Sequence, residues 1–423
     1  MASFYIPLTG LDADSTALNT IANNLSNMNT TGFKAQTVNF ADLFYSQMGT
    51  SGAGDPIQMG AGTQVASTDT DFSTGSPNST GVNTDVALQG NGFFIASNGS
   101  TQYLTRAGDF STNANGDLVT SNGLSVMGYP AVSGVVNTNA PLAPVNIPMT
   151  QVLAPQATST FNMTANLDST TATGTSFPST MDIYDSLGNM HTANITYTAQ
   201  GANTWGYSIA LPASDVGTVT PVTGTLGFNS SGNLTTITPN GGAAETVGTA
   251  AGDVSSIPVA FTGLSDNAAD LSMTWNLLGS GGTPTISQVD STSAVSATTQ
   301  NGYDSGQYQS FSIGSDGTVS VTFSNDQIEK VGQIALGNVT NLQGLQAVGN
   351  GDYESTLASG NTTIGTSGSA GLGAMEGGAL EASNVNISAE FSDLIIAQRA
   401  FEANSKSITT FDTITQETIQ MIH

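Results

Sequence analysis

Hydrophobic residues near the N-terminus recur every seven positions. Leu11, Leu18 and Leu25 have this spacing, and Leu8, Ser15 and Ala22 fill the alternate positions. The pattern predicts one apolar stripe on a helix of at least about three turns. The run ends at Asn27-Met28-Asn29-Thr30-Thr31-Gly32, whose glycine is typical of a helix C-terminus. We therefore predict a helix over residues 1–28.

The C-terminus has the same period. Its apolar stripe consists of Ile387, Leu394, Phe401 and Ile408, with Phe391, Ala397, Asn404 and Phe411 between them and Ile414, Met421 and Ile422 after them. We predict a helix of about 35 residues, with Ser383 or Asn384 as its N-cap. Matching heptads at both ends indicate that residues 1–28 and 382–423 pair with each other. The alternative is two amphipathic helices on an ordinary core.

These stripes bury too little apolar surface to offset the conformational entropy of ordering both ends. We therefore expect other copies of the chain to supply further surfaces. Arg399 either pairs along its own helix or anchors a neighbouring subunit, and the pattern leaves both roles open. Asn404 lies on the apolar seam, where a polar residue fixes the register of paired helices.

Between the ends the pattern predicts β-structure. Ala87–Ile95 reads as a glycine-punctuated strand pair, and Gly-containing turns predict hairpins over Phe110–Thr120, Phe228–Ile237 and Phe311–Phe323. Residues 150–300 contain no Lys or Arg but nine acidic residues, which indicates an inserted β-domain. The Gly/Ser/Thr-rich tract 359–378 predicts an extended or linker segment. The fold class is thus mainly β with paired helical termini.

Composition excludes several functions of the 423-residue chain. Its 31 acidic and five basic residues give a net charge of −26, which argues against nucleic-acid partners and against anionic lipid. No apolar run approaches the roughly 20 residues of a membrane span, so we expect no membrane insertion. There is no cysteine, and there are two histidines, His191 and His423. We therefore expect no metal and no cofactor, and no enzyme.

Two acidic clusters carry candidate chemistry. Asp182 and Asp185 lie near His191, where an acid–base site is conceivable, but the intervening Ser186-Leu187-Gly188-Asn189 favours a hairpin turn. Asp69 and Asp71 lack the loop pattern of a calcium site. An acidic hydrolase remains a competing hypothesis, although the sequence offers it no convergent carboxylate pair.

Three sets of short motifs occur along the chain. Those near the N-terminus are Leu8-Thr9-Gly10-Leu11, Ile21-Ala22-Asn23-Asn24-Leu25-Ser26-Asn27 and Asn29-Thr30-Thr31-Gly32-Phe33-Lys34. Those near the C-terminus are Leu380-Glu381-Ala382-Ser383-Asn384-Val385-Asn386, Glu390-Phe391 and Gln398-Arg399-Ala400-Phe401-Glu402-Ala403-Asn404. Those between the ends are Gly90-Asn91-Gly92-Phe93-Phe94, Thr105-Arg106-Ala107-Gly108-Asp109-Phe110 and Asn115-Gly116-Asp117-Leu118. The terminal motifs resemble those of the family of bacterial flagellar rod and hook axial proteins, and the motifs between the ends resemble the β-core of that family.

Length and the acidic insert favour the hook branch of the family. The segment Asp182–His191 and the later Asn203-Thr204-Trp205 resemble the outer hook domain, whereas rod proteins are shorter. The cysteine cross-link of some hooks is excluded here. The resemblance implies a nested multidomain layout: helices 1–28 and 382–423 as inner tube, connectors 29–72 and 365–381, a middle β-domain of 73–148 and 302–364, and an outer β-domain of 149–301.

The resemblance also implies a function. It is a structural subunit that self-assembles into a curved, flexible tube, transmits motor torque as a universal joint and encloses the export channel. Implied partners are other copies in a helical homo-polymer, the hook cap, the distal rod, the hook–filament junction proteins and the type III export apparatus. The location would be extracellular, after export without a cleaved signal peptide. The alternatives are a distal rod or other axial component, or an adhesin-like fibre.

The resemblance and the heptads together nominate assembly residues. The N-terminal set is Leu11, Leu18, Leu25, Asn23, Asn24, Asn27, Thr31, Gly32, Phe33 and Lys34. The C-terminal set is Phe391, Leu394, Gln398, Arg399, Phe401, Asn404, Ile408 and Phe411.

Overall fold

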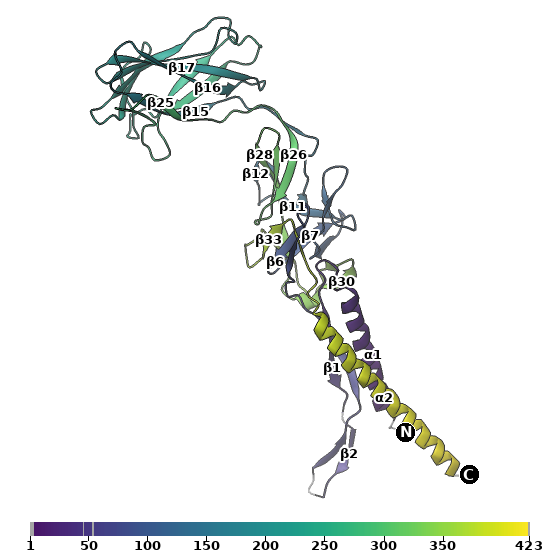
Figure 1. Cartoon of the computed structure of the whole chain (residues 1–423). Coiled ribbons are helices and arrows are strands. Elements are labelled where there is room, and N and C mark those ends of the chain that lie inside the picture. Colours follow the sequence, from purple (N-terminus) through teal and green to yellow (C-terminus); the bar gives the residue numbers. More distant parts are fainter. Residues whose placement is uncertain (1–3, 45, 53–54, 422–423) are drawn as a thin grey trace. The chain divides into compact units, whose positions relative to one another are not determined.

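A computed structural model of the chain describes residues 4–44, 46–52 and 55–421 (Figure 1). Met1–Ser3, Ile422 and His423 belong to the predicted helices and lie outside the described residues. The chain divides into two compact units. The first contains residues 1–149, 310–322 and 328–423, and the second contains residues 150–309 and 323–327. Within the described ranges no helix is both long and apolar enough to cross a membrane.

Helices occupy the two ends of the chain, as the heptads predict. Helix α1 spans Tyr5–Ser26 and helix α2 spans Ile387–Met421, which is 35 residues. The predicted N-caps of α2 are wrong, because Asn386 caps it: its Oδ1 accepts hydrogen bonds from the N–H groups of Ser388 and Ala389. Gly32 is not at the end of α1 either, since the helix ends at Ser26.

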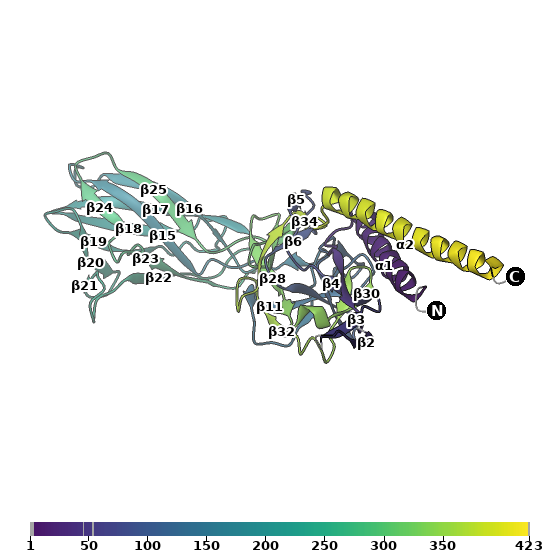
Figure 2. The same cartoon turned by 90° about the horizontal axis from the view of Figure 1, so that it is seen from below.

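The two helices lie side by side and antiparallel in both views (Figures 1 and 2). Three contacts fix the direction: Asn24 meets Glu390, Asp14 meets Asn404, and Phe4 meets Phe411 with ring centroids 5.9 Å apart. The predicted pairing of the termini is confirmed.

A 3₁₀ turn, η1, spans Leu342–Gly344 in the same unit.

The β-part of the first unit is built mainly on one large sheet. Its central order is β27-β28-β11-β7-β8-β31-β30. The strands are β27 (Thr318–Phe323), β28 (Ile328–Ile334), β11 (Ser125–Val132), β7 (Phe93–Ser97), β8 (Gln102–Thr105), β31 (Asp352–Glu354) and β30 (Gln346–Gly349). Attached strands are β9 (Ser111–Thr112), β10 (Leu118–Val119), β12 (Val135–Val136), β13 (Ala143–Pro144), β29 (Leu336–Asn338) and β32 (Thr363–Gly365). Strand β26 (Gly306–Ile313) neighbours β27 and begins in the residues of the second unit.

Short two-stranded pairs complete the β-structure of the first unit. They are β1 (Gln36–Asp42) with β4 (Thr63–Thr70), β2 (Ser46–Thr50) with β3 (Pro56–Met59), β5 (Pro77–Ser79) with β34 (Ala379–Glu381), and β6 (Val86–Gln89) with β33 (Ala374–Gly377). The last two pairs join segments from opposite ends of the chain. The Gly/Ser/Thr-rich tract is thus extended, as predicted, but β33 pairs it with β6 instead of leaving it a free linker.

The second unit is a sandwich of two sheets. One has the order β22-β23-β15-β24, with β25 also on β15, and the other has the order β16-β17-β18-β19-β20-β21. The strands are β15 (Thr160–Asp168), β22 (Ser256–Phe261), β23 (Leu271–Asn276), β24 (Ile286–Val289), β25 (Ala294–Gln300), β16 (Ser176–Tyr184), β17 (Met190–Gly201), β18 (Thr204–Ala210), β19 (Val222–Phe228), β20 (Leu234–Pro239) and β21 (Glu245–Thr246). Strand β14 (Val152–Leu153) pairs with β26.

Alternating burial explains the sandwich. Every second residue of β15 and β17 is buried, as period-two strands with one inward face require. Both sheets contribute to one apolar core, in which Trp275 stacks on Phe161 at 5.9 Å and meets Tyr207 edge-on at 5.5 Å. The three predicted hairpins are confirmed as β9–β10, β19–β20 and β26–β27. In Ala87–Ile95 the two predicted strands form, but β6 and β7 pair with other strands and not with each other.

Candidate functional site

A polar contact lies within the seam of the helix pair. The Asn404 side-chain Nδ2 donates to Asp14 Oδ2 at 2.8 Å, and both residues are half-buried in the seam. The Asn404 side chain also packs closely on Gly10, because a Cβ added to Gly10 would lie 2.7 Å from Asn404 Nδ2. A polar pair inside an apolar seam favours one alignment over its neighbours. Asn404 thus lies in a polar contact within the seam, and its role in setting the register stays a prediction.

Asn24, near the C-terminal end of α1, links α1 to β1 and α2 by hydrogen bonds. It is buried, its Nδ2 donates to Glu390 Oε1 at 2.9 Å and to the Gln36 carbonyl at 2.7 Å, and its Oδ1 accepts from the Gln36 N–H at 2.9 Å. These bonds hold β1 and α2 to α1. Burial raises the pKa of Glu390, although the Asn24 hydrogen bond opposes the rise.

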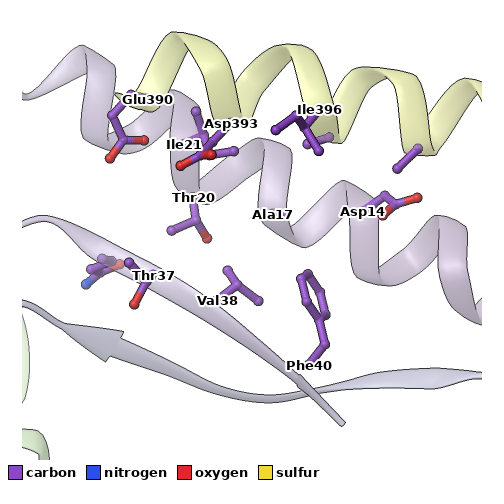
Figure 3. Close-up of a pocket in the computed structure, with 13 residues that line it drawn as sticks. Asp14, Ala17, Thr20, Ile21, Thr37, Val38, Phe40, Glu390, Asp393 and Ile396 are labelled. Atoms are coloured by element: carbon purple, nitrogen blue, oxygen red, sulfur yellow. The ribbon is translucent and has the colours of Figure 1, made fainter. Parts of the chain in front are cut away.

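A groove lies between α1, α2 and β1 (Figure 3). Its volume is about 280 Å³, and its apolar side includes Ile21, Val38, Phe40 and Ile396. Phe40 is 50% exposed and Ile396 66% exposed, so the groove presents apolar surface to solvent. Its acidic side consists of Asp14, Glu390 and Asp393.

A buried ion cluster lies near the end of α1 and the start of α2. It consists of Lys34, Arg106 and Glu381. Lys34 Nζ lies 2.6 Å from Glu381 Oε1, and Arg106 Nη1 lies 3.3 Å from Glu381 Oε2. All three residues are at most 2% exposed. Lys34 also donates to the Ser73 carbonyl at 2.7 Å. The cluster joins the segment after α1, the end of β8 and the segment before α2.

Arg106 makes further contacts within the ion cluster, although its buried Nε has no hydrogen-bond partner among the described residues. Arg106 Nη2 donates to the Gly90 carbonyl at 2.8 Å, and its guanidinium lies 5.2 Å from the centre of the Phe93 ring. Burial lowers the pKa values of Lys34 and Arg106, whereas Glu381 raises both. The single carboxylate thus faces two buried cations, and its removal leaves both without their charged partner.

Gly32 packs directly against the ion cluster. Its φ of +65° favours glycine, and an added Cβ would lie 2.6–2.8 Å from backbone atoms of Arg106 and Ala107. Its N–H donates to the Glu381 carbonyl at 2.8 Å. The sequence suggests Gly32 as a helix terminus, but in the structure it allows the backbone to pass close to the backbone of Arg106 and Ala107.

The predicted assembly residues fall into three groups. Buried ones are Asn24, Gly32 and Lys34. Half-buried ones are Leu11, Leu18, Leu25, Asn27, Thr31, Phe33, Leu394, Phe401, Asn404, Ile408 and Phe411. Exposed ones are Asn23, Phe391, Gln398 and Arg399. Lys34 and Asn24 therefore make their contacts within the chain, whereas the role of the exposed residues in assembly stays a prediction.

Arg399 makes a contact along its own helix. Its Nη1 lies 3.5 Å from Glu402 Oε2, and the two side chains are 79% and 69% exposed. An exposed pair of this kind contributes little to stability.

Sequence reasoning did not identify Asp14, Arg106 and Glu381 as partners. The scarcity of basic residues was the usable signal, because two of only five basic residues lie in the ion cluster.

A second polar cluster lies in the second unit. The predicted turn after Asp185 is confirmed, since β16 and β17 form a hairpin. His191 Nε2 lies 3.3 Å from Asp185 Oδ2, and Nδ1 lies 3.1 Å from Asp215 Oδ2. Burial raises the pKa of Asp185, but its interactions with Asp266, the Asn189 N–H and His191 bring that pKa to about 2. Burial lowers the pKa of His191, but Asp215 and Asp185 raise it by more. The net effect is a pKa above the ordinary value of histidine.

Family profiles match the chain in four places. They are a flagella basal body rod protein (residues 4–34), a flagellar hook protein FlgE/F/G D1 domain (87–166), a flagellar basal body protein FlaE D2 domain (154–303) and a flagellar basal body rod FlgEFG protein C-terminal region (376–421). Together they extend over both terminal helices and both units.

Individual relatives match over nearly the whole chain. The flagellar hook protein FlgE of Salmonella typhimurium is 35% identical over 97% of this chain and 98% of its own length. That of Escherichia coli is 34% identical over 97% and 98%, and that of Treponema pallidum 32% identical over 98% of both chains. The crystal structure of Helicobacter pylori flagellar hook protein FlgE2 has a TM-score of 0.53 at 16% identity, covering 71% of this chain and 99% of that one, which indicates a shared fold.

Proposed function

We propose that copies of this chain, which belongs to the flagellar hook protein family and is a structural subunit of the flagellar hook, assemble through its terminal helix pair. Such assembly is head-to-tail and does not close on itself, so it generates a helical tube. The homologues are structural proteins, and we assign no enzymatic activity to the chain.

The observation that carries this proposal is the apolar surface left on the helix pair. An amphipathic helix normally buries its large apolar side chains. Here many of them are between 39% and 80% exposed: Tyr5, Ile6, Leu8, Ile387, Phe391, Ile395, Ile396, Ile414, Ile419 and Met421. Exposed apolar surface of this extent is typical of an interaction site. A second copy of the same helix pair is the occupant that the heptad spacing suits.

The groove between α1, α2 and β1 extends this surface. Its exposed Phe40 and Ile396 face the same opening (Figure 3). An apolar side chain of a neighbouring copy would fill it. Its acidic side, Asp14, Glu390 and Asp393, suits a cation from that neighbour, and Arg399 is an exposed cation on α2.

Replacing Ile414 and Met421 by serine is expected to weaken assembly strongly. They are 52% and 80% exposed and lie seven residues apart on α2, so they share one face. Covering one such side chain contributes about 1.5–3 kcal/mol, so losing two raises the critical concentration for polymerisation by about 100-fold or more. The measurement is sedimentation of polymer over a range of protein concentrations at constant salt.

The matched control replaces Gln416 and Gln420 by serine. Both are exposed on α2 and carry similar helix-propensity changes, but they lie on another face. An equal loss of assembly in this control would show that α2 stability, and not the apolar face, limits polymerisation. Full assembly by Ile414→Ser/Met421→Ser would contradict the proposal.

We further infer the layout of the assembled tube. Residues 1–28 and 382–423 would surround the export channel, with 29–72 and 365–381 as connectors, 73–148 and 302–364 as the middle domain and 149–301 as the outer domain. The expected partners are the cap, distal rod and junction proteins and the type III export apparatus. The hook location follows from family membership, and export without a cleaved signal is part of the proposal.

Bending requires neighbouring outer domains to slide. In a rotating curved tube, each row of subunits lengthens and shortens once per turn, so contacts must exchange among near-equal states. The absence of cysteine makes a clean test available, because engineered thiols are the only ones present. Ser230→Cys and Ser280→Cys place thiols at exposed positions of the second unit.

Cross-linking these thiols between subunits with bismaleimides of graded length is expected to straighten or stall the hook without preventing assembly. Short linkers should act most strongly, since they permit the least sliding. Swimming speed and hook curvature in electron micrographs are the measurements. Normal swimming with completely cross-linked outer domains would refute sliding.

A further inference from the structure

We propose that His191, Asp185 and Asp266 form a binding site for one divalent cation of the zinc class in the second unit. The three side chains come from separate places: the turn after β16, the start of β17, and the loop between β22 and β23. One ligand atom from each lies within 4.8 Å of the other two. Asp185 and His191 are buried, and the Asp266 side chain is 27% exposed, which leaves one side open to solvent.

The distances fit a tetrahedral ion. His191 Nε2 lies 3.3 Å from Asp185 Oδ2 and 3.5 Å from Asp266 Oδ2. Ligand atoms about 2.0–2.2 Å from zinc, at the tetrahedral angle, are about 3.4 Å apart. A cation can therefore replace the Nε2 proton with little movement of the side chains. Solvent would supply the fourth ligand.

Neighbouring groups orient all three ligands. Asp215 Oδ2 lies 3.1 Å from His191 Nδ1, and by accepting a hydrogen bond from Nδ1–H it directs Nε2 towards the two carboxylates. Asn189 Nδ2 donates to Asp185 Oδ2 at 3.2 Å and to Asp266 Oδ2 at 3.0 Å. Metal-binding histidines and carboxylates commonly have such outer hydrogen bonds.

The charge balance of the unit also favours a cation. Residues 150–309 and 323–327 contain no Lys or Arg, and His191 is their only histidine. Three carboxylates therefore converge on a single imidazole, which neutralises at most one of them. A divalent cation with neutral His191 reduces the remaining charge from −2 to −1 by simple addition of formal charges.

Ligand type selects the class of cation. Calcium takes about six to eight oxygen ligands, and magnesium binds mainly through oxygen. Imidazole nitrogen together with carboxylate is the chemistry of zinc and related transition metals. Because Asp185 and His191 belong to the six-stranded sheet and Asp266 to a loop of the other sheet, the ion would link both layers of the sandwich.

The test is zinc titration of the full chain by calorimetry at neutral pH, in a His423→Gln background so that His191 is the only histidine. We expect one zinc ion per chain. His191→Gln should remove measurable binding, and Asp266→Asn and Asp215→Asn should each weaken it by about 10- to 100-fold. Asp290→Asn, an exposed acid of the same unit, should bind as the parent does.

Both tryptophans, Trp205 and Trp275, lie in the second unit, so their fluorescence verifies its folding in each variant. Zinc should also raise the midpoint of the fluorescence-detected thermal transition in the parent but not in folded Asp266→Asn. No saturable binding, or equal binding by Asp266→Asn and the parent, would overturn the site. The cluster would then be only an ionic contact between turns.

Discussion

A chain lacking residues 1–30 and 383–423 is expected to stay monomeric where the full chain forms tubes. The deletion removes α1, α2 and the exposed apolar side chains on both helices. Hydrophobic contact between copies is non-directional and proportional to the apolar area covered, so its removal leaves no comparable driving force. Negative-stain electron microscopy after salt-induced polymerisation is the measurement.

The truncated chain carries its own control. It retains Lys34, Arg106 and Glu381, and the second unit is untouched. Tryptophan fluorescence should therefore report the same thermal transition as in the full chain. Tubes from the truncated chain would show that the β-domains alone direct assembly, which contradicts the proposal.

Replacing Glu381 by alanine is expected to produce the largest loss of stability from one substitution. Lys34 and Arg106 would remain buried without their carboxylate, and removing one partner of a buried ion pair costs about 3–5 kcal/mol. The Gly75 N–H, which donates to Glu381 Oε1 at 2.8 Å, would also lose its acceptor. The measurement is urea unfolding followed by far-UV circular dichroism, because the described helices all belong to the first unit.

Two comparisons make this result specific. Glu402→Ala removes an exposed carboxylate from α2 and should change the unfolding midpoint little. The fluorescence transition of the second unit should not move in Glu381→Ala. A loss below about 1 kcal/mol in Glu381→Ala, the scale of surface pairs, would show that water reaches the two cations.

Periodicity made the terminal helices predictable. Leu11, Leu18 and Leu25 repeat with the period of a coiled-coil seam, and an apolar stripe on a helix follows from local spacing alone. The hairpins were predictable for a related reason, since a turn such as Asn115-Gly116-Asp117 acts within a few residues. The cap of α2 was predicted wrongly because Ser383, Asn384 and Asn386 are all acceptable caps by type. Only the tertiary contacts of Asn384, which accepts from the Ala35 N–H at 2.8 Å, distinguish them.

The polar partners could not be predicted from the sequence. Glu381 meets Lys34 and Arg106 across separations of 347 and 275 residues, and no local pattern encodes such a meeting. Asp215 and Asp266 reach His191 from turns that look like ordinary solvated loops. Asp266 belongs to a loop of the other sheet, so its approach to His191 depends on how the two sheets stack, which the period of each strand does not specify.

The long separation between Lys34 and Glu381 has a consequence for the order of folding. A chain that emerges from a narrow channel in either direction presents one of these residues first and the other 347 residues later. The ion cluster can close only after nearly the whole chain is out. The second unit, most of which is one continuous segment, has no such delay and can fold while the rest is still passing through. In the export proposed above, the helix pair would therefore be completed after the second unit has folded, and the proposed assembly surface would form last.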